Sequence, residues 1–355
     1  MSDHFRYVST IFKLSGYLPS LKTLKTKILK YVFSPIMFTL ITFIIYNFRY
    51  MHHDIFEIAR TCEALSTHGH VFGRKLAVLK HANLIEQVIN DRNFFWSYEK
   101  FGEKLGQRFR QKLFFRDYVM KSLSAMSVLM LAYFYLTPVF VRSVNLPQAS
   151  WVPQFSHATA LVYFCQVVCL SESIPVAVII DGTFLLMGAE LEIQFNLLKK
   201  TLKAVEIGQN SGQKHEEKCL KQLKICASYH DFLLKEHVKM KTIFSEFFLL
   251  QYLLSIEGLC IELFVVNKAQ TWGQFALGAI YVVGIIMQSS FTFLSASNLE
   301  IEAESLADSI YDVDWYNAKD PRIRKHILFM LMKAQEPLRL TGAGLFDVNR
   351  NMLLQ

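Results

Sequence analysis

The chain has 355 residues, of which 52% are hydrophobic and 19% are charged, and its formal net charge is +8. Soluble domains usually carry about 25% charged residues, so this composition is unusually apolar. The apolar residues are also gathered into runs that are free of charge and long enough to cross a bilayer as a helix of about 20 residues. A large soluble helical bundle does not need such runs. We therefore predict an all-α, polytopic helical membrane protein.

The first half of the chain contains three apolar segments separated by basic ones. Residues 1–30 are basic and lack the apolar core and the cleavage site of a signal peptide. The first predicted span, residues 31–48, is free of charge, whereas residues 55–79 contain five charged side chains and alone would pass for an amphipathic surface helix. Residues 80–117 are polar and basic, and they predict a cytosolic helical extension. Residues 122–141 form a third span without charge.

The second half of the chain contains three further apolar segments. Residues 142–157 contain two prolines and several aromatic side chains, and they predict an extracellular loop with aromatic anchors. The helical pattern of residues 158–180 continues to about residue 198, which is too long for one crossing at ~1.5 Å per residue, so this helix should protrude from the membrane. Residues 201–242 form a lysine-rich cytosolic segment, and residues 243–299 hold the fifth and sixth spans.

The positive charges determine the predicted orientation in the membrane. Four alternate segments hold 6, 8, 10 and 6 Lys and Arg residues, whereas the three loops between them hold one each. Basic segments face the cytosol, and the alternation works only if residues 55–79 cross the membrane. The N-terminus is therefore predicted to be cytosolic, with four spans in residues 31–200 and six in all. Such an orientation excludes a G-protein-coupled receptor, whose N-terminus lies outside the cell.

Residues 300–346 differ in character from the spans and carry a recognisable pattern. Two amphipathic stripes are separated by a break at Asp320-Pro321, because proline cannot donate a backbone hydrogen bond and restricts the residue before it. We predict two short cytosolic helices here. The segment resembles the C-terminal signature of insect odorant receptors in Glu304, Ser305, Tyr311, Trp315, Tyr316, Gln335, Pro337, Leu338, Thr341 and Gly344.

The resemblance implies a tuning subunit of an odorant-gated, non-selective cation channel in the plasma membrane of an olfactory sensory neuron. In that family such a subunit forms a heterotetramer with a co-receptor subunit, joined mainly through the cytosolic helices and the final span, and seven spans are expected. Residues 347–355 would then be the start of the seventh span, so we expect this chain to be truncated before that span. A gustatory-receptor-type channel subunit is the nearest alternative. A small-molecule transporter is a weaker one, because the chain shows no internal repeat and no paired broken helices.

The predicted orientation also selects residues for a ligand pocket in the outer half of the membrane. A small hydrophobic volatile molecule needs an apolar, aromatic-lined cleft with a few polar groups. The candidates are Met130, Tyr133, Phe134 and Thr137 in the third span, Tyr163, Gln166, Val167 and Leu170 in the fourth, and Phe275 and Tyr281 in the sixth. Aromatic stripes in spans more often serve helix packing or the interfacial belt, which is the alternative for each of them.

Other chemistry finds little support in the sequence. No catalytic motif is present, so we predict that the protein is not an enzyme and binds no cofactor. His215, Cys219, Cys226 and His230 share one helical face, but the two pairs lie ~16 Å apart along the axis, too far to share a metal ion. The net positive charge is explained by topology and by anionic inner-leaflet lipids, not by nucleic acid. The intramembrane acids Glu172, Glu257 and Glu262 indicate either a proton or ion relay, or contact with a cavity or with Lys121 or His157.

Overall fold

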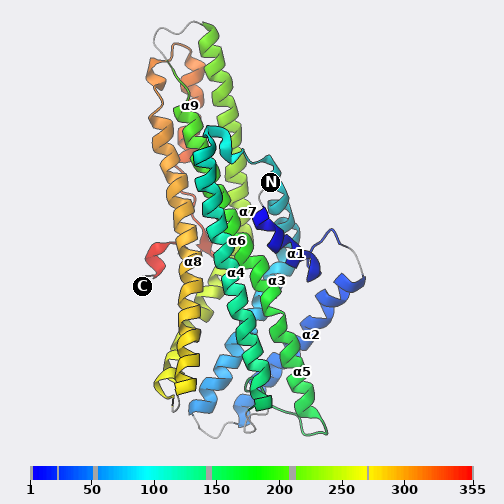
Figure 1. Cartoon of the computed structure of the whole chain (residues 1–355). Coiled ribbons are helices and arrows are strands. Elements are labelled where there is room, and N and C mark those ends of the chain that lie inside the picture. Colours follow the sequence, from blue (N-terminus) through cyan, green and yellow to red (C-terminus); the bar gives the residue numbers. More distant parts are fainter. Residues whose placement is uncertain are drawn as a thin grey trace.

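The computed structural model describes residues 3–21, 24–50, 55–140, 146–207, 213–269 and 272–353, and in them the chain is a bundle of long helices running along one common axis (Figure 1). The predicted all-α class is confirmed. Four of the predicted loop residues, 142–145, lie outside the described residues.

The described residues of the N-terminal half form four α-helices. They are α1 (Arg6–Leu14), α2 (Leu24–Asn47), α3 (Ile55–Asp91) and α4 (Glu103–Phe140). Short 3-10 helices lie at Asp3–Phe5, Phe48–Tyr50, Arg92–Phe94 and Tyr98–Phe101. The predicted extension at residues 80–117 is thus not a separate helix: its first part is the end of α3 and its last part is the beginning of α4.

In the part of the C-terminal half that the structure describes, the chain forms five α-helices and one small hairpin. They are α5 (Ala158–Ser171), α6 (Ser173–Lys203), α7 (Gln213–Asn267), α8 (Trp272–Tyr311) and α9 (Pro321–Ala334). Strands β1 (Thr341–Gly342) and β2 (Phe346–Asp347) pair antiparallel, with Thr341 opposite Asp347 and Gly342 opposite Phe346. A 3-10 helix at Trp315–Asn317 precedes α9, and another at Arg350–Leu353 follows the hairpin.

Two boundaries differ from the sequence-based expectation, and each has a local cause. The helix predicted to run from residue 158 to about 198 is broken at Glu172, because Pro175 has no N–H for the preceding turn. The first of the two predicted cytosolic helices is the end of α8, which runs without interruption out of the sixth predicted span. The break before the second is where it was predicted: the Asp320 carboxylate accepts a hydrogen bond of 2.8 Å from the backbone N–H of Arg322 and caps α9.

Helix lengths show that the bundle is taller than a bilayer. The 55 residues of α7 correspond to ~80 Å at 1.5 Å per residue, compared with a hydrocarbon core of ~30 Å. Within the described residues, α2, α4, α5 with α6, α7 and α8 are long and apolar enough to cross a membrane. The predicted second span lies in α3, which is long enough to cross a membrane but is less apolar than these helices because of its charged side chains. The beginning of α7, the end of α8 and α9 gather at one end of the bundle, and α5 lies at the other (Figure 1).

Helix α6 is the centre of the bundle and packs against α1, α3, α4, α7 and α8. The core beside it contains the aromatic cluster of Phe184, Phe244 and Phe248, with ring centroids 5.0 to 6.0 Å apart. The two amphipathic stripes of the C-terminal segment are confirmed by the burial of Leu299, Leu306, Ile310, Val313, Ile323, Ile327, Met330 and Ala334. Burial of these stripes attaches α8 and α9 to the rest of the bundle.

Candidate ligand-binding cavity

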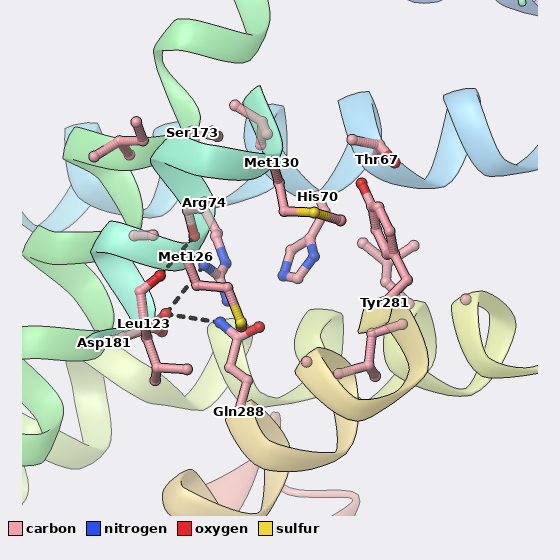
Figure 2. A pocket seen from close by; sticks show the side chains of 18 of the residues that line it. Thr67, His70, Arg74, Leu123, Met126, Met130, Ser173, Asp181, Tyr281 and Gln288 are labelled. Carbon is pink, nitrogen blue, oxygen red and sulfur yellow. Dashed lines mark hydrogen bonds and ion pairs between the residues drawn. The ribbon is translucent and has the colours of Figure 1, made fainter. Parts of the chain in front are cut away.

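A cavity of about 280 Å³ lies among α3, α4, α6, α7 and α8, with the last turn of α5 at its edge. Its walls are mostly apolar, and Figure 2 shows the thioethers of Met126 and Met130 pointing into it between α3 and α8. Two serines of α4 also line it, but their hydroxyls donate to carbonyls of their own helix, Ser124 to Met120 at 2.9 Å and Ser127 to Leu123 at 3.0 Å. These hydroxyls are therefore already satisfied, and the wall is less polar than its sequence implies.

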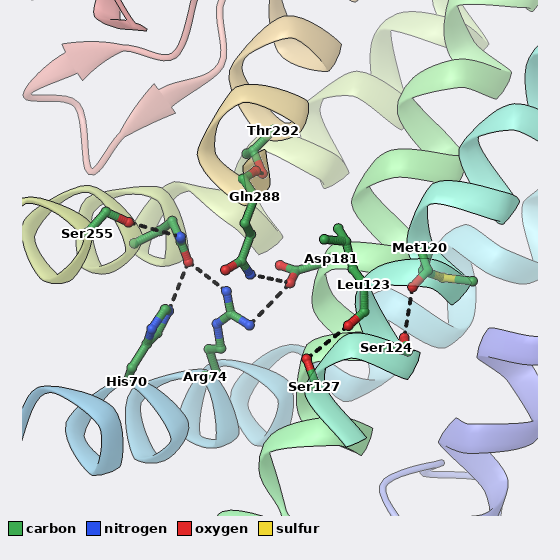
Figure 3. Close-up of polar contacts among 11 residues, drawn as sticks. His70, Arg74, Met120, Leu123, Ser124, Ser127, Asp181, Ser255, Gln288 and Thr292 are labelled. Atoms are coloured by element: carbon green, nitrogen blue, oxygen red, sulfur yellow. Dashed lines mark hydrogen bonds and ion pairs between the residues drawn. The ribbon is translucent and has the colours of Figure 1, made fainter. Parts of the chain in front are cut away.

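One end of the cavity is closed by a buried polar network (Figure 3). Arg74 of α3 donates to the Asp181 carboxylate of α6 at 3.1 Å and to the Gln251 side-chain oxygen of α7 at 2.6 Å. Gln288 of α8 donates to the same Asp181 oxygen at 2.8 Å. His70 Nε2 lies 2.8 Å from the Gln251 oxygen, so four helices meet in one set of hydrogen bonds.

The network contains the Arg74–Asp181 ion pair, which is largely buried from solvent. The side chain of Arg74 is 7% exposed and that of Asp181 is 15% exposed. A buried charge is tolerated only when a counter-charge and hydrogen bonds compensate it, and the Arg74 guanidinium also lies 5.2 Å from the centre of the Phe247 ring. The Nε atom of Arg74 is the one part of the group without a hydrogen-bond partner among the described residues.

The chain matches the family model described as 7tm Odorant receptor over residues 96–355, which is more than half of its length. The chain belongs to the odorant receptor family. The family predicted from the C-terminal signature is thus confirmed, and with it a multi-pass helical membrane protein.

Individual relatives of this odorant receptor are distant. It is 26% identical over 137 residues to odorant receptor 22b of Drosophila melanogaster, covering 38% of this chain and 34% of that protein. It is 24% identical over 230 residues to odorant receptor 10 of Aedes albopictus, covering 62% of this chain and 59% of that protein. The matched part therefore spans less than two thirds of either relative.

The fold is also that of a solved receptor. The insect olfactory receptor OR5 from Machilis hrabei superposes with a TM-score of 0.76 at 14% identity, over 99% of this chain and 96% of that chain. The same receptor in complex with eugenol gives a TM-score of 0.74 at 15% identity. At such low identity the likeness establishes the fold alone.

Four of the ten predicted ligand-binding residues line the cavity of this odorant receptor, namely Met130, Phe134, Leu170 and Tyr281. The hydroxyl of Tyr281 points across the cavity toward α3 near Thr67 (Figure 2). Phe134 and Tyr281 also contact each other edge to face, with centroids 6.1 Å apart. The predicted faces of the third and sixth spans thus meet around one space.

The other six predicted residues lie outside the lining of the cavity. Tyr133 is 48% exposed and Phe275 is 44% exposed, the latter against Trp272. The Thr137 hydroxyl donates to the Tyr133 carbonyl, and the Tyr163 hydroxyl donates to the Tyr135 carbonyl. The Tyr135 hydroxyl in turn donates to the Val167 carbonyl. The Gln166 side chain forms hydrogen bonds with the backbone of Gln148 and with the Ser150 hydroxyl. Their role in ligand binding stays a prediction.

No residue of α3 was predicted to line the cavity, and on α7 only the acids Glu257 and Glu262 were predicted to contact one. The available signal was the charge within the weakest predicted span, since Glu63 and Arg74 both line the cavity and ionisable residues inside a membrane usually serve a function. Of the three intramembrane acids, only Glu262 lines the cavity. Glu172 instead accepts from the Tyr17 hydroxyl at 2.6 Å and lies 3.5 Å from the buried Lys75 ammonium, not beside Lys121 or His157.

The signature residues hold the C-terminal segment against the bundle. Ser305 accepts a hydrogen bond of 2.8 Å from Lys199, Gln335 ends α9, and Leu338 packs against the main core. Gly344 lies in the hairpin turn with φ of +74°, a conformation that costs glycine little. Tyr311 and Tyr316 are more than 60% exposed. The Tyr316 hydroxyl donates to the Asp314 carboxylate at 2.9 Å, and both tyrosine rings contact Trp315 edge to face.

Proposed function

We propose that this odorant receptor binds a small, largely apolar organic molecule in the cavity between α3, α4, α6, α7 and α8. The observation that carries the proposal is the cavity itself, whose wall is mostly thioether, aliphatic and aromatic surface, with polar side chains contributed by each of the five helices. Pockets for drug-sized ligands have volumes of ~300–1,000 Å³. A space of about 280 Å³ therefore suits a smaller molecule of the size of a volatile odorant.

We further propose that ligand binding acts on a non-selective cation channel that the receptor forms with a co-receptor subunit in the plasma membrane, its N-terminus in the cytosol. Support comes from the position of the Arg74–Asp181 network. It closes the cavity and joins four helices, so a ligand that displaces one of its members changes how those helices pack. The signature residues of α8, α9 and the hairpin, at which the family resemblance implies subunit contacts, belong to the same helical framework.

Filling the cavity tests the proposal. Replacing Met130, which lines the cavity, with Trp should abolish ligand-induced thermal stabilisation of the purified receptor. The matched control is Leu129→Trp, which adds similar bulk at the next residue of α4, where the side chain is 70% exposed. Ligands that stabilise the wild type and the Met130→Trp variant equally would place their binding site elsewhere.

The channel proposal has its own test. Ligands that stabilise the purified receptor should evoke cation current in cells that express it with a co-receptor, and Met130→Trp should remove that response. If Met130→Trp retains an evoked current as large as that of Leu129→Trp, gating does not depend on ligand binding in this cavity.

A further inference from the structure

The acid Glu262 of α7 differs from the other buried acids of the described residues. Its side chain lines the cavity, is 4% exposed, and makes no hydrogen bond or ion pair to any described residue. The remaining buried acids each have a partner at 2.5 to 2.7 Å, as seen for Asp117 with Lys121, Glu172 with Tyr17, Glu190 with Tyr98 and Glu236 with Lys239. A buried carboxyl group without a hydrogen-bond partner lowers the stability of the folded protein. Its position at the cavity wall indicates that a ligand supplies the partner.

A second acid faces the same end of the cavity. Glu63 of α3 lines it, and its carboxyl group is within electrostatic range of both Glu262 and the Tyr281 hydroxyl. Among the described residues, the cation acting on Glu63 is Arg60, one turn earlier on α3, whose side chain is exposed and does not line the cavity. Two acids and one peripheral cation leave this end of the cavity short of one positive charge.

The opposite end of the cavity does not attract charge of either sign. The Arg74 cation there is already neutralised by Asp181 at 3.1 Å and bonded to Gln251. Counting the charged groups in the lining gives one cation, Arg74, against three acids, Glu63, Asp181 and Glu262. The cavity as a whole therefore favours a cationic ligand and disfavours a carboxylate.

The groups around Glu262 also suit a cation with an apolar body. Phe134 and Tyr281 supply aromatic rings at this end, and aromatic faces attract ammonium groups. Met130 supplies a flexible thioether surface for an alkyl or aryl chain.

We propose that the cavity selects small molecules that carry a basic amine, bound with the nitrogen at the Glu262 carboxylate, with Glu63 as a second acceptor and the apolar body against Phe134, Tyr281 and Met130. This inference rests on the proposed function, since it names the class of ligand for that cavity. A neutral amine that enters can take the proton of the carboxylic acid, or an ammonium ion can pair with the carboxylate; both give the same ion pair.

Three probes of nearly equal shape test the inference: 2-phenylethylamine, 2-phenylethanol and propylbenzene. Affinities are measured from the concentration dependence of the melting temperature of the purified receptor. The amine should bind roughly 10- to 150-fold more tightly than propylbenzene, which is the range that a hydrogen bond to a charged group supplies. The alcohol should lie between them.

Two variants identify the group responsible. Glu262→Gln removes the charge with little change of shape, and it should lower the affinity for the amine toward that of propylbenzene while leaving propylbenzene binding unchanged. Glu257→Gln is the matched control, an acid on the same helix that does not line the cavity. Without ligand, Glu262→Gln should also melt at a higher temperature than the wild type, because an uncompensated buried acid is removed.

The outcomes separate this inference from the proposed function. Equal affinities for the amine and propylbenzene, or amine binding that survives Glu262→Gln, would overturn the amine inference and leave the cavity as the ligand site. Binding of none of the three probes would overturn both. A preference for the amine that Glu257→Gln removes and Glu262→Gln does not would move the site to the other acid and overturn this assignment.

Discussion

The Arg74–Asp181 pair allows a stability prediction with a calculated size. Asp181→Asn keeps the shape of the side chain but removes the charge that compensates the buried Arg74 guanidinium. Loss of one partner of a buried ion pair costs ~3–5 kcal/mol, because the other charge stays buried and uncompensated. With an unfolding entropy of ~2.1 cal/mol/K per residue, a chain of 355 residues loses roughly 4–7 °C in melting temperature.

Two comparisons isolate the cause. Asp312→Asn breaks the contact of Asp312 with Lys203, in which the side chains are 61% and 59% exposed, and an exposed pair contributes only ~0–1 kcal/mol. The double variant Arg74→Met with Asp181→Leu removes both buried charges and should recover most of the lost stability, because apolar groups of similar size often replace a buried pair without loss.

The assay is thermal unfolding of the purified receptor in detergent, without ligand. Asp181→Asn should have the lowest melting temperature of these variants. A fall no larger than that of Asp312→Asn would show that the pair is hydrated and that the closed end of the cavity is not as described. Failure of the double variant to recover would instead assign the stability to the hydrogen bonds of Gln251 and Gln288.

The remaining predictions concern the cavity, the C-terminal stripe and the orientation. In a titration of the purified receptor, Phe134→Ala should weaken the free energy of ligand binding by ~1–3 kcal/mol. Tyr133→Ala, at a side chain that is 48% exposed, should leave the affinity unchanged. Equal effects of the two substitutions would argue against the cavity as the ligand site. Ile327→Ala, in the buried stripe of α9, should lower the free energy of unfolding by ~2–5 kcal/mol, measured by thermal unfolding. The adjacent Leu328→Ala, at a side chain that is 59% exposed, should lower it much less. The reverse order would refute the packing of α9 against the bundle. An N-terminal epitope tag should be stained only after cells are permeabilised, and staining of intact cells would reverse the orientation.

Many of the helices could be predicted because their positions depend on residues that are close together in the sequence. Uncharged runs mark helices that can cross a membrane, and the Asp320-Pro321 pair marks the beginning of α9 by capping chemistry alone. The stripe of Ile323, Ile327 and Met330 indicates which face of α9 is buried. The end of α8 was misjudged because a change from apolar to amphipathic composition does not interrupt a helix; only a breaker does.

The candidate site was only partly predictable, because its polar parts are set by pairs that are far apart in sequence. Nothing near Arg74 in the chain indicates that Asp181, 107 positions later, lies 3.1 Å away. Tyr133 and Phe134 are both aromatic and adjacent, yet one is half exposed and the other is 8% exposed. Sequence periodicity defines a helical face no more finely than ~100° per residue, and the rotation of α4 within the bundle decides which of the two faces the cavity.

The arrangement of α7 joins the cavity to the C-terminal segment through a single rigid element. Gln251 takes part in the polar network at one end of the cavity. The next residue, Tyr252, packs against Phe346 of the hairpin, with ring centroids 4.9 Å apart and ring planes tilted by 48°. Two turns earlier, the Ser245 carbonyl accepts a hydrogen bond of 2.9 Å from the Ala343 backbone N–H in the hairpin turn. Because α7 continues without a break through these positions, one helix contacts both the polar end of the cavity and the hairpin that carries Thr341 and Gly344 of the family signature.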